Sequence, residues 1–212
     1  YLGEISLMDA QIGRVLNALD ALGLADDTLG IYTTDHGDMC GSHGMIDKHF
    51  VMYDELVRVP LIARWPGRIA PGSVCDSFIA HEIDLASTFC DAGGVPIPDT
   101  FRGQSLLPLM TGDATDNGRE DIMSMYHGNQ FGLYSQRMIR DRRWKYVWNP
   151  TAEDELYDLH ADPAELTNRT TDPACADELA RLRLRLIDWM RDTHDPLVNP
   201  WNITQLTEGL SL

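Results

Sequence analysis

The most informative part of the sequence runs from Thr33 to Lys48 and reads TTDHGDMCGSHGMIDK. It follows a β-rich run over residues 28–34 that predicts a buried strand. The stretch itself contains several glycines and no hydrophobic periodicity, so we predict a loop that begins where the strand ends. In open α/β sheets, ligands bind beyond the carboxyl ends of the strands. Asp35 therefore occupies a position that favours a functional role.

Two neighbouring side chains of this loop suit a divalent cation. The carboxylate of Asp35 and the imidazole of His36 can reach one cation if the backbone turns sharply, and Gly37 permits such a turn. Lys48, at the far end of the loop, could place an ammonium group beside that cation. A divalent cation and a lysine together form a pocket for a tetrahedral oxyanion. An isolated Asp-His pair is a weak signal, because most such pairs are loop residues or helix caps.

The first part of the chain predicts an α/β sheet. Residues 2–22 carry apolar side chains at three- and four-residue steps, which is typical of an amphipathic helix, and Gly23 is a natural stop. We expect a second strand at residues 57–65 and a second helix at residues 82–92. This order of elements suits a doubly wound sheet. Only two or three parallel-type strands are recognisable, whereas open sheets have about four to six, so we expect further strands upstream of Tyr1.

The later part of the chain has a different character. Four strand-like runs separated by turn signals predict an antiparallel meander, at residues 121–126, 133–140, 144–148 and 155–159. Asp172 and Pro173 then begin a final helix, as its N-cap and its first helical residue.

These patterns predict two domains. Residues 1–112 are expected to be the C-terminal part of a partial, doubly wound α/β domain. Residues 113–212 are expected to form a small α+β subdomain, in which an antiparallel sheet is followed by a long helix over residues 173–193.

Charge and composition exclude several classes of partner. Seventeen basic residues stand against 33 acidic ones, which gives a formal net charge of −16. A field of that sign repels nucleic acid and anionic membrane surfaces, so we expect neither as a partner. No apolar run approaches the roughly 18–20 residues that cross a bilayer. The four cysteines form no CxxC pair, which argues against a disulfide scaffold or a structural zinc site and leaves the compartment open.

The loop is also similar to a known block of sequence. The string from Asp35 to Lys48, followed by residues 53–55 and 58–62, resembles the second metal-binding block of sulfatases, which belong to the alkaline-phosphatase-like superfamily. Three strings downstream resemble the small C-terminal subdomain of sulfatases: Arg137-Met138-Ile139-Arg140, Trp144-Lys145-Tyr146 and Glu155-Leu156-Tyr157-Asp158-Leu159. The resemblance covers most of residues 1–193 and implies a partial alkaline-phosphatase-like α/β fold.

The resemblance implies roles for individual residues. Asp35 and His36 would be ligands of a divalent metal, which in sulfatases is usually Ca2+. Lys48 would be catalytic, since it would contact the sulfate and stabilise charge on the departing oxygen. His127 stands at the start of the small subdomain, which borders the substrate cleft in some sulfatases, so substrate contact is one expectation and packing is the other. His43 could orient the loop or touch the substrate, but a structural hydrogen bond to the backbone is the main expectation.

Departures from the family pattern narrow the prediction. Sulfatases use a formylglycine made from cysteine or serine in Cys/Ser-X-Pro-X-Arg, and no cysteine or serine of this sequence stands in such a motif. The paired aspartates that normally follow the first strand are also absent. We therefore predict the C-terminal portion of a formylglycine-dependent hydrolase that acts on a small-molecule or carbohydrate sulfate ester. It would need the N-terminal half of the same protein as its partner and would be inactive alone.

Two alternatives stay open at this point. An Asp-His pair also occurs in the related phosphonate monoester and phosphodiester hydrolases, which tend to use a transition metal such as Mn2+. A degenerate module that binds without catalysis would carry the same blocks.

Overall fold

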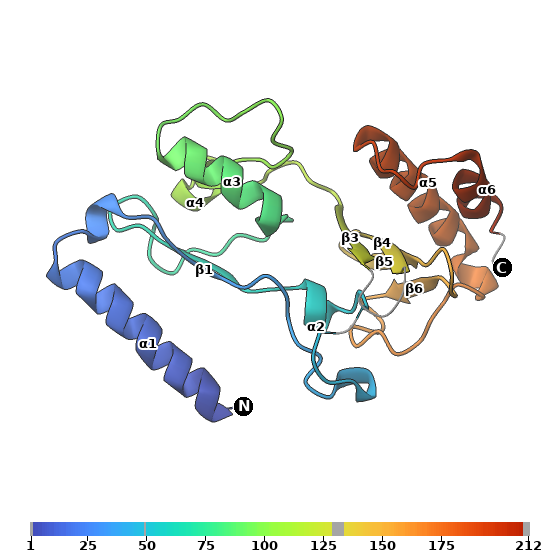
Figure 1. The fold of residues 1–212 in the computed structure, drawn as a ribbon, viewed down its shortest axis with the longest axis horizontal. Coiled ribbons are helices and arrows are strands. Elements are labelled where there is room, and N and C mark those ends of the chain that lie inside the picture. The colour runs from blue at the N-terminus through green and yellow to red at the C-terminus, as the bar shows by residue number, and fades with distance from the viewer. Residues whose placement is uncertain (1, 49, 129–133, 210–212) are drawn as a thin grey trace. The chain divides into compact units, whose positions relative to one another are not determined.

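A computed structural model describes residues 2–48, 50–128 and 134–209 of the chain (Figure 1). Contacts divide the chain into two compact units. Unit 1 consists of Tyr1–Asp35 and Pro60–Gly118, and unit 2 consists of His36–Val59 and Arg119–Leu212. The chain thus leaves unit 1 after Asp35, contributes residues 36–59 to unit 2, and returns to unit 1 at Pro60.

This division differs in part from the domains expected from the sequence. Unit 1 ends at Gly118, close to the expected boundary after residue 112. Residues 36–59, however, pack with the C-terminal part of the chain, which the sequence patterns did not predict. The domain limits 1–112 and 113–212 themselves stay a prediction.

Unit 1 combines helices with a ribbon of two strands. Its elements are α1 (Leu2–Ala21), η1 (Ala25–Asp27), β1 (Gly30–Thr33), β2 (Leu61–Arg64), α3 (His81–Ala92) and α4 (Leu107–Thr111). α1 and α3 confirm the two predicted helices. α1 stops near Gly23 because this residue turns the chain at a φ of 67°, and the Leu24 amide donates to the Leu19 carbonyl at 3.0 Å.

The strands of unit 1 pair in antiparallel fashion, with Gly30 opposite Arg64 and Thr33 opposite Leu61. The sequence patterns predicted parallel-type strands here. A parallel pair needs a long crossover, usually a helix, that packs back on the sheet. The connection between β1 and β2 instead belongs to unit 2, and its helical parts are the single turns η2 (Ser42–Gly44) and α2 (Asp54–Val57).

Unit 1 buries few apolar side chains among its described residues. The buried ones are Ala25, Trp65 and Leu106. α1 has no buried residue, and the side chains of Leu2 and Val15 are 79% and 63% exposed. Hydrogen bonds support part of the packing, since buried Asp84 of α3 accepts from the amides of Ala80 and Gln104, both at 2.8 Å. The apolar face of α1 is therefore largely exposed.

Unit 2 contains the predicted meander. Its strands are β3 (Ile122–Gly128), β4 (Tyr134–Arg140), β5 (Trp144–Trp148) and β6 (Glu155–Asp158), and they pair antiparallel in the order β3-β4-β5-β6. η3 (Pro173–Cys175), α5 (Ala176–Asp192) and α6 (Pro200–Glu208) follow. The Asp172 side chain caps η3 by accepting from the Ala174 amide at 3.0 Å, which confirms its predicted place as the N-cap before Pro173. The helix predicted over residues 173–193 is thus η3 followed by α5, and α6 is a further helix that the sequence patterns did not predict.

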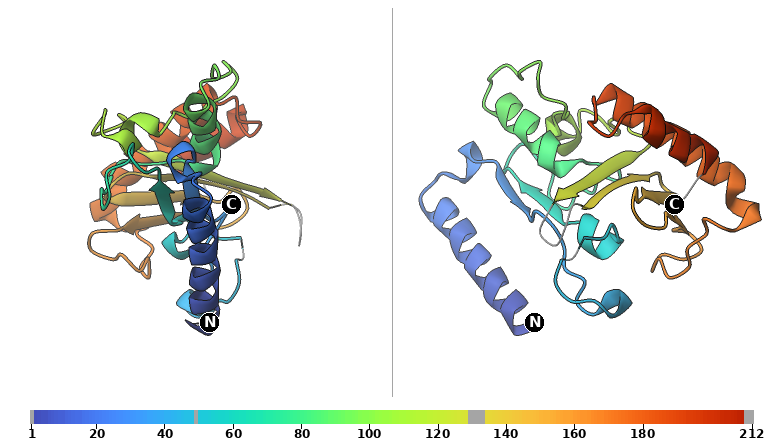
Figure 2. Two further views of the ribbon diagram at one scale, coloured as in Figure 1. Left: turned by 90° about the vertical axis from the view of Figure 1, so that its left-hand side faces the viewer. Right: turned by 45° about the vertical axis from the view of Figure 1, so that its right-hand side comes forward.

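One face of this sheet packs against α5 (Figures 1 and 2). The core on this face joins strand residues to one side of α5 and to α6: Ile139, Trp144, Tyr146, Trp148, Leu156, Leu179, Leu182, Leu186, Ile187, Met190 and Leu206. The apolar stripe of α5 recurs at three- and four-residue steps, which is why this helix buries one side. In the described part of the chain, no helix is both long and apolar enough to cross a membrane.

The other face of the sheet is covered by residues 36–59. Met52 packs with Met138 and Val147, and Val57 and Tyr126 flank this cluster. Since both faces are covered, every residue of β5 is buried. The sheet therefore supports the segment His36–Val59 by direct packing.

Candidate functional site

The predicted metal ligands stand where β1 ends. Asp35 follows the strand with an exposed side chain, whose Oδ1 accepts from the Thr34 hydroxyl at 3.3 Å. His36 is half-buried, and its Nδ1 lies 2.8 Å from the Gly37 carbonyl oxygen. With Nδ1 turned to that carbonyl, Nε2 is the ring nitrogen suited to a cation. In the described part of the chain, no group of three or more His, Cys, Asp or Glu side chains could hold a metal ion.

Gly37 fixes the backbone of this loop against α2. Its amide donates to the Leu56 carbonyl at 2.8 Å. A Cβ at this position would lie 1.8 Å from the Glu55 carbonyl oxygen and 3.2 Å from the Leu56 Cα. Glycine is therefore needed here for a close approach of two backbones.

The rest of the loop folds back on itself. The Met39 amide donates to the Asp47 carbonyl at 3.1 Å, and the Met39 side chain is completely buried. Left-handed residues make the turn, among them Gly41 and Gly44 at φ values of 101° and 71°. Lys48 follows this closure with an exposed side chain, and its amide donates to the Asp47 carboxylate at 2.7 Å. The loop thus closes on itself, while the position of the Lys48 ammonium beside Asp35 and His36 and the role of Lys48 stay predictions.

His43 lies in the loop as a stacked side chain. Its ring is 3.7 Å from the ring of Tyr53, at an interplanar angle of 11°. Its Nε2 is buried and has no hydrogen-bond partner in the described structure, so this atom does not make the expected hydrogen bond to the backbone. Beyond Tyr53, the Tyr157 hydroxyl donates to Glu155 at 3.0 Å, and burial raises the pKa of Glu155 above its ordinary value. No pattern in the sequence predicted this aromatic contact.

His127 occupies an exposed position near the end of β3. Its partner across the sheet is Ser135, whose hydroxyl oxygen lies 2.6 Å from His127 Nδ1. This hydrogen bond orients the ring. Contact with substrate stays a prediction.

A cluster of four charged side chains, which the sequence patterns did not reveal, fastens α2 to the sheet. Asp54 at the start of α2 accepts two hydrogen bonds from Arg140, at 2.7 and 2.8 Å, and lies 2.5 Å from Lys145 Nζ. Lys145 Nζ also lies 2.6 Å from Glu165, which accepts from the Asp54 amide at 2.7 Å. Burial alone would raise the pKa of Asp54, but the charges and hydrogen bonds of Lys145 and Arg140 hold it below its ordinary value. The signal in the sequence was a lysine within an otherwise apolar strand.

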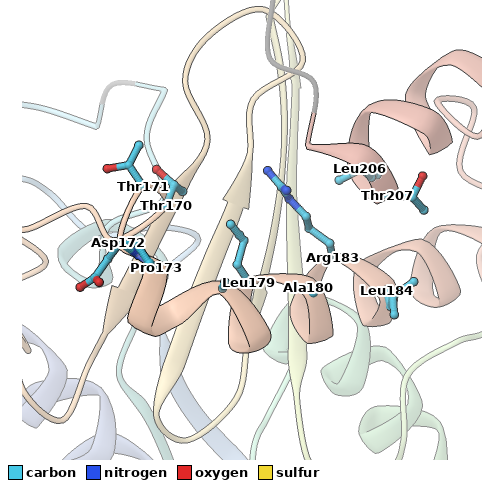
Figure 3. Close-up of a pocket in the computed structure, with 11 residues that line it drawn as sticks. Thr170, Thr171, Asp172, Pro173, Leu179, Ala180, Arg183, Leu184, Leu206 and Thr207 are labelled. Carbon is cyan, nitrogen blue, oxygen red and sulfur yellow. The ribbon is translucent and has the colours of Figure 1, made fainter.

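Unit 2 also contains a hollow of about 310 Å³ between α5, α6 and residues 170–173 (Figure 3). Leu179, Leu184 and Leu206 form part of its lining. Arg183 reaches into it, but this guanidinium donates to the Tyr146 hydroxyl and the Asp154 carboxylate. The hollow contains none of the predicted site residues.

Comparisons with known proteins agree on a family. A family model described as N-sulphoglucosamine sulphohydrolase, C-terminal, matches residues 41–192. An N-acetylglucosamine-6-O-sulfatase of Bacteroides thetaiotaomicron is 36% identical in an alignment of 174 residues that covers 79% of this chain and 31% of that protein. A solved structure of a protein in complex with its substrate, D-glucosamine-2-N,6-O-disulfate, has a TM-score of 0.85 and 32% identity, and covers 93% of this chain and 41% of that one.

A second branch is similar to nearly the same extent. The phosphonate monoester hydrolase of Agrobacterium radiobacter has a TM-score of 0.80 and 32% identity, over 90% of this chain and 40% of that protein. This chain spans less than half of each of these three proteins.

Proposed function

This chain belongs to the sulfatase family and has part of its alkaline-phosphatase-like α/β fold, and from that premise we propose that it supplies the metal-binding loop and the small subdomain of a sulfate-ester hydrolase. One observation carries the proposal: the loop after β1 has Asp35 and His36 at its start and Lys48 at its end. A hydrogen bond from the Met39 amide to the Asp47 carbonyl closes this loop. The family match includes Lys48.

The donors at the start of the loop fit a divalent metal, which sulfatases generally use. Asp35 offers a carboxylate on an exposed side chain, and His36 presents Nε2 because Nδ1 faces a carbonyl. We propose Ca2+, which prefers carboxylate oxygen, and the imidazole extends the range to Mn2+ or another transition metal. A metal bound here would supply positive charge to the oxygens of a sulfate group. Further ligands would come from the proposed N-terminal half.

Lys48 and His127 are the residues proposed to meet substrate. The Lys48 ammonium stands on an exposed side chain and would stabilise negative charge on the departing alcohol oxygen. His127 would donate a hydrogen bond to the substrate from Nε2, with its ring held by Ser135. Both would act without covalent change.

The nucleophile would come from a partner, the N-terminal half of the same protein. The sequence has no Cys/Ser-X-Pro-X-Arg motif, and the apolar face of α1 is largely exposed, as expected of a helix that packs on further strands. The relatives are also more than twice as long as the matched part of this chain. We propose that the chain alone has no sulfatase activity.

The substrate class favoured is a sulfated carbohydrate. One relative reported above is named an N-acetylglucosamine-6-O-sulfatase, and one similar solved structure is in complex with its substrate D-glucosamine-2-N,6-O-disulfate. A phosphonate monoester or phosphodiester hydrolase is the second candidate, supported by the similarity to such an enzyme and by the Asp-His pair. The third candidate is a non-catalytic module.

An activity assay separates these candidates. The chain would be assayed alone and together with the proposed N-terminal half, on an aryl sulfate, 6-O-sulfated glucosamine and an aryl phosphonate. We expect turnover only in the completed protein, faster on sulfates than on phosphonates. Turnover by the 212-residue chain alone would contradict the proposal, and a completed protein inactive on all three substrates would favour the non-catalytic module.

A further inference from the structure

Residues 36–59 are attached to the sheet by charges that are removed from water. The side chains of Lys145 and Glu165 are fully buried, and those of Asp54 and Arg140 are 18% and 19% exposed. Two carboxylates face two cations, so the cluster is electrically balanced. Lys145 Nζ donates in addition to the Met52 carbonyl at 3.0 Å. A buried cation is tolerated only when it is paired and hydrogen-bonded in this way.

Asp54 is the member that joins the sheet to the segment. Its carboxylate is held by Arg140 of β4 and Lys145 of β5, and its own amide is held by Glu165. Glu165 adopts a left-handed conformation at a φ of 54°, which a non-glycine residue rarely takes. The surrounding structure thus fixes both the side chain and the backbone of Asp54.

The contact continues from Asp54 to the proposed metal ligand. Asp54 begins α2, and the Leu56 carbonyl near the end of α2 accepts the Gly37 amide at 2.8 Å. Gly37 approaches the Glu55 carbonyl so closely that no side chain fits between them. His36 directly precedes Gly37, and its Nδ1 faces the Gly37 carbonyl. Movement of α2 would therefore move the backbone and the ring of His36 together.

We propose that Asp54, clamped by Arg140, Lys145 and Glu165, is a positioning residue for His36. It touches no substrate and acts through α2 and Gly37. The inference rests on the proposed function, because His36 is a metal ligand only there. It assigns the sheet of the small subdomain a task in metal binding, in addition to its contribution to stability.

A purely structural role for the cluster makes a different prediction, and the chain offers a matched control. Asp154 has a side chain that is also 18% exposed, and it is bound by Arg183 at 3.0 Å. It also accepts from the Tyr146 hydroxyl at 2.6 Å. Tyr146 belongs to the core that faces α5. Asp154→Asn and Asp54→Asn therefore remove the same charge from equally exposed positions of the same unit.

The first test measures amide hydrogen exchange in the 212-residue chain without metal. Asp54→Asn is expected to speed exchange of the Gly37 amide by about tenfold or more, because α2 is released, while amides of β5 keep their rates. Asp154→Asn should leave the Gly37 amide within about twofold of its original rate. Equal rates at Gly37 in wild type and Asp54→Asn would overturn the inference.

The second test measures the dissociation constant for Ca2+ by calorimetry in the completed protein. Loss of a residue that orients a metal ligand typically weakens metal binding about 10- to 100-fold, so Asp54→Asn should weaken Ca2+ binding by about tenfold and Asp154→Asn should not. Equal weakening in both variants would mean general destabilisation and would overturn the inference. A wild-type protein that binds neither Ca2+ nor Mn2+ would overturn the proposed function itself, a result that the exchange experiment cannot produce.

A milder variant serves if Asp54→Asn does not fold. Arg140→Lys keeps the charge but loses the reach of the guanidinium to both Asp54 oxygens. It should speed exchange of the Gly37 amide and weaken Ca2+ binding, each by a smaller factor than Asp54→Asn. If neither the exchange rate nor Ca2+ binding changes, the inference is overturned.

Discussion

Replacing Gly37 by alanine should open the loop that carries the proposed metal ligands. A methyl group there would stand 1.8 Å from the Glu55 carbonyl oxygen and 2.9 Å from the carbonyl carbon. Both are backbone atoms, so no flexible side chain can move aside. The two backbone segments must separate by more than an ångström, which also breaks or lengthens the bond from residue 37 to the Leu56 carbonyl.

The size of the effect follows from these two contributions. Overpacking in a fixed environment costs about 1–3 kcal/mol, and a lost backbone hydrogen bond costs about 0.5–1.5 kcal/mol. We therefore expect the free energy of local opening of residues 36–59 to fall by about 2–4 kcal/mol. At about 1.4 kcal/mol for each factor of ten, amide exchange at residue 37 should become roughly 30- to 700-fold faster, up to the limit set by global unfolding.

Hydrogen exchange followed by mass spectrometry or NMR measures this directly. Gly44→Ala is the comparison, since a Cβ at Gly44 meets no atom within 4 Å but must adopt a φ of 71°. That conformation costs about 1–2 kcal/mol, and the cost falls on the turn around residue 44. Exchange at residue 37 that is unchanged in Gly37→Ala, or equally fast in both variants, would refute the reasoning.

Three further outcomes are expected. Lys48→Ala in the completed protein should lower kcat by about 10²–10³-fold with an unchanged unfolding midpoint, since the side chain is exposed; a loss below tenfold contradicts its proposed role. Asp195→Asn leaves buried Arg137 without the carboxylate that lies 2.6 Å away and should lower the free energy of unfolding in urea by about 3–5 kcal/mol at pH 7. Burial alone would raise the pKa of Asp195, but the hydrogen bonds and charge of Arg137 hold it below its ordinary value. The stabilisation by Asp195 is therefore complete above about pH 4 and is lost as the pH falls further. If the free energies of unfolding of wild type and variant differ by the same amount down to acid pH, this assignment is contradicted. Leu182→Ala, at a fully buried position of α5, should cost about 2–5 kcal/mol in the same assay, and a cost below about 1 kcal/mol would show that α5 is not held by this core.

Local patterns in the sequence predicted local structure well. The meander of unit 2 was predictable because each strand is bounded by turn residues, and the helical segment of η3 and α5 because Asp172 and Pro173 form a recognisable start. No pattern in the sequence predicted α6. The sulfatase family was predictable from the loop that follows β1, and the family match confirms it. The roles of the individual loop residues stay predictions.

Long-range contacts were not predictable in the same way. The antiparallel pairing of β1 with β2 depends on a connection that packs elsewhere, and no local signal reports this. Asp54 and Lys145 are 91 residues apart in the sequence, and nothing in either surrounding stretch identifies the other as its partner. The lysine within an otherwise apolar strand indicates only that some carboxylate must lie nearby.

The discontinuous composition of unit 2 restricts how such a protein can be recombined. Residues 119–212 look like a module that could be exchanged between relatives as one block. Without residues 36–59, however, that block would keep Lys145 buried but lose its partner Asp54, and it would expose Met138 and Val147 to water. A chimera whose junction falls between residues 59 and 119 therefore mismatches the two stretches. Lineages that exchange this subdomain intact must inherit both stretches together, or accumulate compensating changes at positions 54 and 145.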